Sequence, residues 1–160
     1  AYSMTGWRLG YLAANKEIAQ ACDKIQGQIT SGACSFNQTA AVEALNGSQS
    51  AVKDMLEAFV KRKKIIIDRL RAIEGIICPE PDGAFYVFPD MRFYFGKSYG
   101  TLKIHNSEDL ALYILNEAHV ACVGGASFGD ENCLRFSFAA SEESIHIAFD
   151  RIEVALQKLQ

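Results

Sequence analysis

Two arginines stand in settings where a guanidinium group could bind an anionic ligand. Arg8 follows a Gly-Trp pair where a loop enters an expected strand, and its planar fork could hold a phosphate through two hydrogen bonds. Arg135 lies in "CLRFSFAAS", where strand alternation places it on one face with Ser137 and Ala139. These small neighbours leave room for a ligand carboxylate. An ordinary surface arginine and a solvated strand face also fit the two patterns, so the residues alone leave both alternatives open.

Other kinds of site have weaker support. Gly124, Gly125 and Gly129 do not have the spacing of a phosphate-binding P-loop and no lysine follows them, so a β-turn explains them better. The three histidines lack a neighbouring nucleophile pattern, which leaves a histidine-based hydrolase as a weak alternative. The cysteines form no C-x-x-C pair and have no ligand spacing with histidine, so we expect no metal site and free, buried thiols. The five cysteines are residues 22, 34, 78, 122 and 133.

The composition is that of a globular protein in a reducing cytoplasm. Of the 160 residues, 49% are hydrophobic and 22% are charged, a balance that disfavours intrinsic disorder. The formal net charge of -3 provides no electrostatic basis for nucleic-acid binding, and the basic run at 61–64 reads as the solvated part of a helix. No apolar stretch reaches membrane-spanning length and no leader pattern is present. We therefore expect no nucleic-acid or membrane partner.

Alternating strand and helix patterns give a mixed fold. We expect a strand over residues 7–14 and a helix capped by Asn15 whose apolar positions recur at helical spacing. A short helix over 38–45 precedes the longest element, a helix opened by Ser48 or Ser50 and ended by Gly75. Beyond it the expected elements are strands at 84–88, 120–123 and 133–138, an irregular excursion at 90–106, and helices capped by Ser107 and Ser141.

The long helix is longer than a small domain needs, so we expect it to link two bodies. At about 1.5 Å per residue it would run roughly 35 to 40 Å. The mixed elements that follow it predict an α/β or α+β body of about 85 residues. We place boundaries at residues 1–47, 48–75 and 76–160.

Several segments resemble the class I/II aminotransferases, pyridoxal-phosphate enzymes of fold type I, and most of all their bacterial aspartate aminotransferase branch. The stretch "MTGWRLGY" at 4–11 is similar to the family's Ser-Lys-x-x-x-Met-Thr-Gly-Trp-Arg motif. Further similar segments follow in the family's order: "FNQTAAVEAL" at 36–45, "PDGAFYVFPD" at 81–90, "VACVGGASFG" at 120–129 and "LRFSFAAS" at 134–141. One departure is Gly124, where the family usually has proline.

The resemblance implies roles for both arginines. Arg8 would bind the phosphate of pyridoxal 5'-phosphate, and Arg135 would bind the α-carboxylate of the substrate. The lysine that forms the Schiff base with the cofactor would stand immediately before Ala1, so no catalytic residue is expected within these 160 residues. The chain alone should therefore be inactive.

The resemblance also implies a domain plan and an activity. Residues 1–47 would be the trailing remnant of the large cofactor-binding domain, 48–75 the linking helix and 76–160 the small C-terminal domain. The intact protein would be a cytoplasmic homodimer that transfers an amino group between an amino acid and a 2-oxo acid, aspartate and 2-oxoglutarate being the expected pair. Two alternatives stay open, namely a related fold-type I lyase or synthase and a non-catalytic interaction module derived from such an enzyme.

Overall fold

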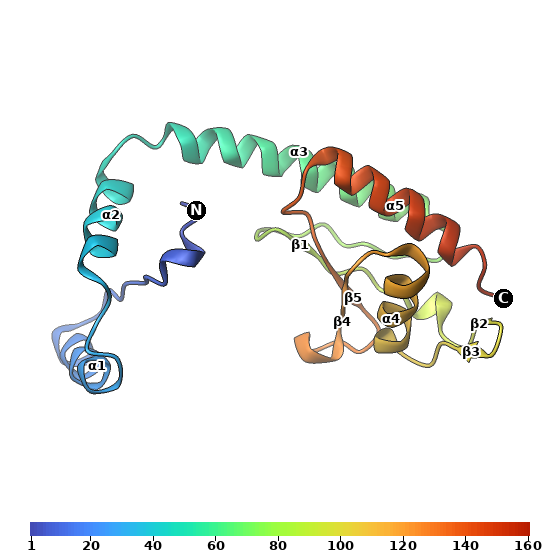
Figure 1. Ribbon diagram of the computed structural model, residues 1–160, viewed down its shortest axis with the longest axis horizontal. Coiled ribbons are helices and arrows are strands. Elements are labelled where there is room, and N and C mark those ends of the chain that lie inside the picture. The colour runs from blue at the N-terminus through green and yellow to red at the C-terminus, as the bar shows by residue number, and fades with distance from the viewer. The chain divides into compact units, whose positions relative to one another are not determined.

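A computed structural model describes residues 1–160, which divide into two compact units, residues 1–56 and 57–160. Figure 1 labels their helices and strands, and each unit is considered by itself. The long helix α3 (Ser50–Ala72) contributes its first residues to the first unit and the remainder to the second. Its 23 residues correspond to a length of about 34 Å. The expected helix at 48–75 is therefore confirmed, with slightly shorter ends.

The first unit is built from helices and irregular segments. A short 3-10 helix, η1 (Thr5–Trp7), is followed by α1 (Lys16–Ile29) and α2 (Ser35–Asn46). The Asn15 cap is confirmed, because its Oδ1 accepts a hydrogen bond of 3.0 Å from the Ile18 amide. The expected strand at 7–14 is wrong. This segment has no neighbouring strand with which to form a ladder, and its backbone is irregular up to α1.

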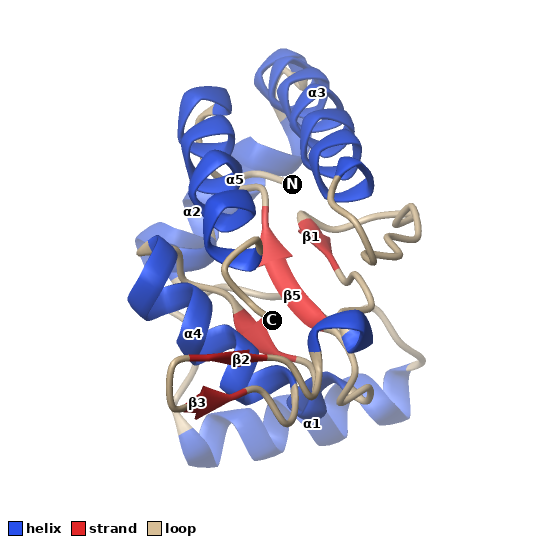
Figure 2. Ribbon diagram, turned by 90° about the vertical axis from the view of Figure 1, so that its right-hand side faces the viewer, coloured by secondary structure: helices blue, strands red, loops and turns tan.

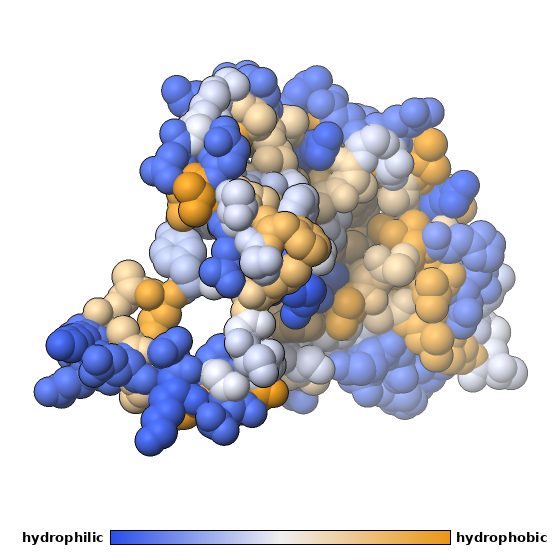
Figure 3. Space-filling view, turned by 60° about the vertical axis from the view of Figure 1, so that its left-hand side comes forward, coloured by the Kyte–Doolittle hydropathy of each residue, from blue (hydrophilic) through white to orange (hydrophobic).

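No side chain of the first unit is buried. The apolar residues at helical spacing in α1 are at the surface instead of in a core, and Figure 3 shows apolar residues interspersed with hydrophilic ones in the first unit. The exposed large apolar residues of this unit are Trp7, Tyr11, Leu12, Ile18, Ile25, Ile29, Phe36, Val42, Leu45 and Leu56. The first unit thus has one clearly amphipathic helix, α1, but no core of its own.

The second unit is organised around a three-stranded antiparallel sheet. Strand β5 (Leu134–Ser137) lies between β1 (Tyr86–Val87) and β4 (Val123–Gly124), as Figure 2 shows. A separate two-stranded hairpin consists of β2 (Ser98–Tyr99) and β3 (Leu102–Lys103). Short 3-10 helices, η2 (Arg92–Tyr94) and η3 (Ala126–Phe128), occupy two of the connections. Of the strands expected in this unit, those at 84–88 and 133–138 are present but shorter, whereas the one expected at 120–123 is displaced to Val123–Gly124.

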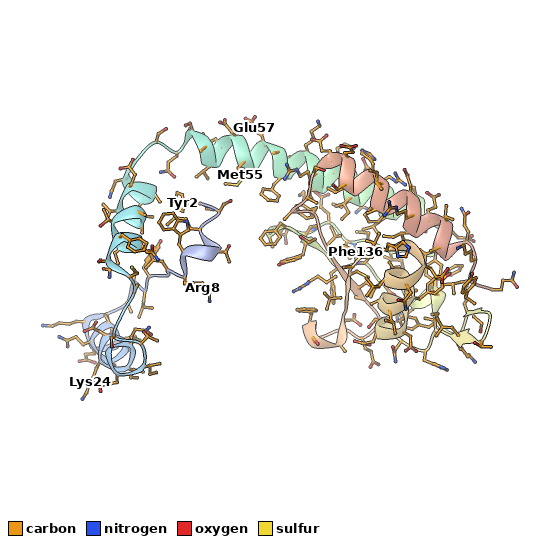
Figure 4. All side chains as sticks on the ribbon, in the orientation of Figure 1. Tyr2, Arg8, Lys24, Met55, Glu57 and Phe136 are labelled. Atoms are coloured by element: carbon orange, nitrogen blue, oxygen red, sulfur yellow. The ribbon has the colours of Figure 1, made fainter.

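Two further helices complete the second unit and enclose its core. These are α4 (Ser107–Ala118) and α5 (Glu142–Leu156), joined by a 2.7 Å hydrogen bond from the Tyr113 hydroxyl to the Ala155 carbonyl. Phe136 of β5 lies near α5, where its ring is 5.8 Å from that of Phe149 (Figure 4). Buried residues of α3, α4, α5 and β5 form one continuous cluster. The predicted α/β (α+β) class is confirmed by this arrangement.

The caps of the second unit match the sequence prediction in one helix and differ in the other. Ser141 caps α5 as expected, accepting a 3.1 Å hydrogen bond from the Ser144 amide. The residue that caps α4 is Asn106, whose Oδ1 accepts from the Asp109 amide at 2.9 Å. Ser107 is instead fully buried and accepts a hydrogen bond from the amide of Gly125. None of the helices combines the length and the apolar character needed to span a bilayer.

Candidate functional site

Arg135 lies on the less buried face of the central strand. Its neighbours Leu134 and Phe136 are buried on the core side, whereas Ser137 on its own side is exposed. This alternation was predicted, and it makes the next residue of β5 on the same face, Ser137, a small one. Val123 of β4 is its cross-strand partner. The sheet therefore fixes the backbone of Arg135 from both sides while its side chain stays accessible.

Two aromatic rings flank the Arg135 guanidinium. Its central carbon lies over the Tyr86 ring at 4.4 Å from the centroid and over the Phe128 ring at 3.9 Å. Both distances fall within the range in which a cation is attracted by the face of an aromatic ring. Tyr86 comes from β1, where it pairs with Ser137, and Phe128 comes from η3. We call these two residues the aromatic clamp.

No acidic side chain neutralises Arg135. It takes part in none of the ion pairs of the chain, and its side chain donates no hydrogen bond to another group of the protein. Two acids of the segments that adjoin β5 and η3 are engaged with other groups. Asp130 accepts hydrogen bonds from the backbone and side-chain amides of Asn132, which lower its pKa, and the Arg92 guanidinium lowers the pKa of Asp90. The donors of Arg135 are thus free for an external acceptor.

The turn that presents Phe128 is held by a buried contact. Gly125 precedes η3, and its amide donates a 3.2 Å hydrogen bond to the Ser107 hydroxyl. A Cβ at Gly125 would overlap the carbonyl oxygens of Asp130 and Cys133, so only glycine fits the turn without a backbone shift. The position of Phe128 is therefore determined by close packing behind it rather than by its own burial.

Arg8 directly follows η1 in the first unit and is labelled in Figure 4. Its backbone adopts the left-handed conformation, with φ of 51°, which is uncommon for a residue other than glycine. The side chain is exposed and makes a single hydrogen bond, from Nη1 to the Thr5 carbonyl at 3.3 Å. Asn37 of α2 holds the preceding residue, because its Nδ2 donates a 2.7 Å hydrogen bond to the Trp7 carbonyl.

The surroundings of Arg8 fit a phosphate group. Four of its five N–H donors have no partner within the protein, and no aspartate or glutamate precedes Glu17 in the chain. A guanidinium with free donors and no competing acid matches the charge and geometry of a phosphate. Arg8 belongs to the first unit and Arg135 to the second, so the two candidate groups lie in different units of the chain.

The second unit also contains a cavity of about 410 Å³ between α5, β5 and the segment at 119–121. Its walls are mainly apolar, with His119, Ser144 and Arg151 as the main polar contributors. No group of three or more histidine, cysteine or acidic side chains that could hold a metal ion exists in the chain. This cavity has neither a nucleophile–base pair nor a cluster of charges, so Arg135 is the better candidate for ligand binding.

Comparison with known proteins identifies the family. The model of the aminotransferase class I and II family matches residues 1–152, almost the whole chain. The chain belongs to the class I and II aminotransferases. An aspartate aminotransferase of Pinus pinaster is 43% identical over 166 residues, covering 100% of this chain and 33% of the relative. A bifunctional aspartate and glutamate/aspartate-prephenate aminotransferase of Petunia hybrida is 45% identical, covering 98% and 33%.

Solved structures of aminotransferases have the same fold over the same length. The crystal structure of the aspartate aminotransferase from Rhizobium meliloti matches with a TM-score of 0.94 and 39% identity, covering 100% of this chain and 40% of the other. An aromatic aminotransferase of Pyrococcus horikoshii matches with a TM-score of 0.86 and 34% identity, covering 98% and 40%. This aminotransferase chain therefore spans about a third of the length of the curated relatives and two fifths of the solved chains.

The structure adds two residues to those that the sequence singled out. Neither Tyr86 nor Phe128 was predicted to contact Arg135, although both lie in segments that carry the family resemblance. Tyr86 could be found only by knowing that β1 pairs with β5, since its partner Ser137 shares a face with Arg135. Phe128 reaches Arg135 through a turn, and no periodicity in the sequence encodes that contact.

Gly124, where the family usually has proline, lies against the side chain of Glu108. Gly124 is buried in β4, and a Cβ at this position would lie 2.5 Å from a carboxylate oxygen of Glu108. Glu108 is in the first turn of α4, where a negative charge is favourable, and its carboxylate accepts a hydrogen bond from Ser107. The glycine thus makes room for a side chain at the start of the neighbouring helix.

Proposed function

We propose that this chain is the C-terminal part of a pyridoxal-phosphate-dependent aminotransferase acting on an amino acid and a 2-oxo acid. The observation that carries the proposal is the Arg135 guanidinium, which has no acidic partner and lies between two aromatic rings on the less buried face of β5. Several relatives are named aspartate aminotransferases, which supports aspartate and 2-oxoglutarate as the substrate pair. In this proposal Arg135 binds the substrate α-carboxylate and so orients the Cα–H bond that must break.

Arg8 is proposed to hold the cofactor phosphate with its free donors. When bound, pyridoxal phosphate supplies an electron sink for the charge that develops at the substrate Cα. The lysine that attaches the cofactor is proposed to stand directly before Ala1. Residues 1–47 then belong to the large cofactor domain, 48–75 link it to the small domain at 76–160, and the 160 residues alone do not transaminate.

The exposed apolar side chains of the first unit support a further part of the proposal, which is assembly as a cytoplasmic homodimer. Helix α1 presents Ile18, Ile25 and Ile29 to solvent, and apolar surface of this kind favours association. We expect the 160-residue chain to form dimers or larger species in light scattering at high concentration. A clean monomer would contradict this expectation.

The function is tested with the longer protein that contains these residues. We expect R135K to raise the KM for aspartate and for 2-oxoglutarate at least tenfold, because an ammonium cannot bind a carboxylate through two parallel hydrogen bonds. We expect R8Q to weaken pyridoxal phosphate binding at least tenfold in equilibrium dialysis. R69K is the matched control, since Arg69 forms ion pairs with Asp150 and Glu153, with which neither candidate arginine is paired.

Unchanged kinetic constants in R135K would contradict the proposal, as would transamination by the 160-residue chain supplied with pyridoxal phosphate.

A lyase or synthase of the same fold type is the second candidate, because it would use both arginines in the same way. Product analysis separates the two. A transaminase forms the new amino acid and the new 2-oxo acid in equal amounts, whereas a lyase or synthase releases products without that balance.

A further inference from the structure

We propose that Tyr86 and Phe128 are positioning residues that hold the Arg135 guanidinium in the orientation in which it binds a substrate carboxylate. The inference rests on the proposed function of Arg135 and extends it to two residues with no assigned role. Both rings lie within 4.4 Å of the guanidinium carbon, and they come from different parts of the chain, β1 and η3. Two separate elements therefore converge on one cation.

The aromatic contacts leave the hydrogen-bond donors of the guanidinium without an oxygen partner in the protein. A cation held over the face of a ring is attracted by the ring quadrupole, and that attraction makes no use of the N–H donors. No carbonyl or carboxylate of the protein takes those donors either. The clamp thus restricts the motion of the Arg135 side chain and leaves its N–H donors free. Because the side chain is already ordered, less entropy is lost when it binds a carboxylate.

The contact with Phe128 is not a consequence of core packing. Phe128 is 44% exposed and lies outside the buried cluster, and its other aromatic neighbour, Phe88, meets it edge-on at 6.5 Å. The turn that carries it is fixed from behind by the Gly125 amide and the Ser107 hydroxyl. Removing the ring should therefore change the surroundings of Arg135 without opening a cavity in the core.

The experiment measures carboxylate binding and kinetics in the longer, cofactor-loaded protein. The probe is succinate, an unreactive dicarboxylate, titrated by calorimetry into the wild type, F128L and Y86L. We expect each substitution to raise the Kd for succinate and the KM for aspartate at least fivefold, with kcat changed less than twofold. F128Y restores the aromatic face and should stay within twofold of wild type.

A matched control is available in η2. Phe93 is likewise 44% exposed, lies in a 3-10 helix and has a cation over its ring, the Lys97 ammonium at 4.3 Å. F93L therefore removes a comparable ring and a comparable cation contact, but one that involves Lys97 and not Arg135. Its Kd for succinate should equal that of the wild type.

A double variant tests whether the clamp acts through Arg135. In an R135K background, F128L should change the Kd for succinate less than twofold, because the group that it positions is gone. The proposed positioning role of the clamp is contradicted if F128L and Y86L bind succinate with the wild-type Kd while R135K binds it more weakly. It is also overturned if F128L has the same effect with arginine or lysine at 135. A wild-type protein that neither binds succinate nor transaminates overturns the proposed function itself.

Discussion

The two units of the chain both contain helices with apolar residues at helical spacing, but only the second unit buries those residues. In the second unit those residues form a continuous buried cluster, whereas in the first unit every apolar side chain remains at least partly exposed. Amphipathic periodicity therefore predicts that a helix forms and which side is apolar, but not what covers that side.

The difference bears directly on the two candidate arginines. Arg135 is positioned by a sheet with a core behind it, so its backbone is held by contacts within the second unit. Arg8 is positioned by a short turn and one hydrogen bond from Asn37 to the Trp7 carbonyl. Within this chain, Arg135 is thus supported by a folded core, whereas Arg8 is supported by local contacts only.

The largest contrast is expected from truncating one leucine in each unit. Leu134 is 0% exposed in β5, so L134A should lower the free energy of unfolding by about 3 to 4 kcal/mol through lost burial and a cavity. Leu45 in α2 is 49% exposed, so L45A should cost less than about 1 kcal/mol. Urea unfolding followed by circular dichroism measures both, and Trp7 fluorescence reports the first unit separately. Equal losses would contradict the contrast.

Thiol reactivity compares the same two units without mutation. Cys22 and Cys34 of the first unit are exposed and Cys122 is half-buried, so the expectation of buried thiols is confirmed only for Cys78 and Cys133. In the second unit, burial raises the pKa of Cys122 to about 12. Burial is also the main reason that the pKa of Cys133 rises to about 11 and that the pKa of Cys78 is raised. Two thiols should therefore react quickly with a disulfide reagent and three slowly.

The pH dependence of the slow thiols follows from those pKa values. Only the thiolate attacks the reagent, and a group with a pKa near 12 is about one part in 10,000 ionised at pH 8. The Cys122 reaction should be at least 100-fold slower than that of the exposed pair and should accelerate about tenfold for each pH unit between 7 and 10. Five thiols reacting at one rate in the native chain would contradict the account.

A smaller contrast is expected between two glycines. G125A should destabilise the second unit by about 2 kcal/mol, because the added methyl would overlap two backbone carbonyl oxygens that cannot move independently. Nothing lies within 4 Å of a Cβ built at Gly6, so G6A should change stability by less than about 0.5 kcal/mol. Thermal unfolding of the two variants beside the wild type provides the comparison. If G125A is as stable as the wild type, the turn before η3 has room for a methyl group and the contrast is contradicted.

The elements that depend on local signals could be predicted, and those that depend on distant partners could not. The caps at Asn15 and Ser141 and the alternation around Arg135 require only neighbouring residues, and the structure confirms all three. The expected strand at 7–14 is absent because a strand needs a partner to satisfy its backbone, and none is present in the first unit.

The aromatic clamp is the part of the candidate site that sequence reasoning missed. It depends on pairing between β1 and β5 and on the turn that brings η3 back over the sheet. The cap of α4 is a similar case, since Asn106 and Ser107 are both good capping residues. Ser107 is drawn inward by the Gly125 amide, a contact 18 residues away in sequence.

The most direct test of the central claim is the mass and peptide map of the protein purified from its source cells after borohydride reduction. We predict a chain well over twice 17.6 kDa, with a lysine directly before Ala1 that carries the reduced cofactor. Trypsin would not cleave at that modified lysine, so one peptide should run through it and end at Arg8. A mature protein of about 17.6 kDa that begins at Ala1 and carries no cofactor would contradict the account and favour a non-catalytic binding role.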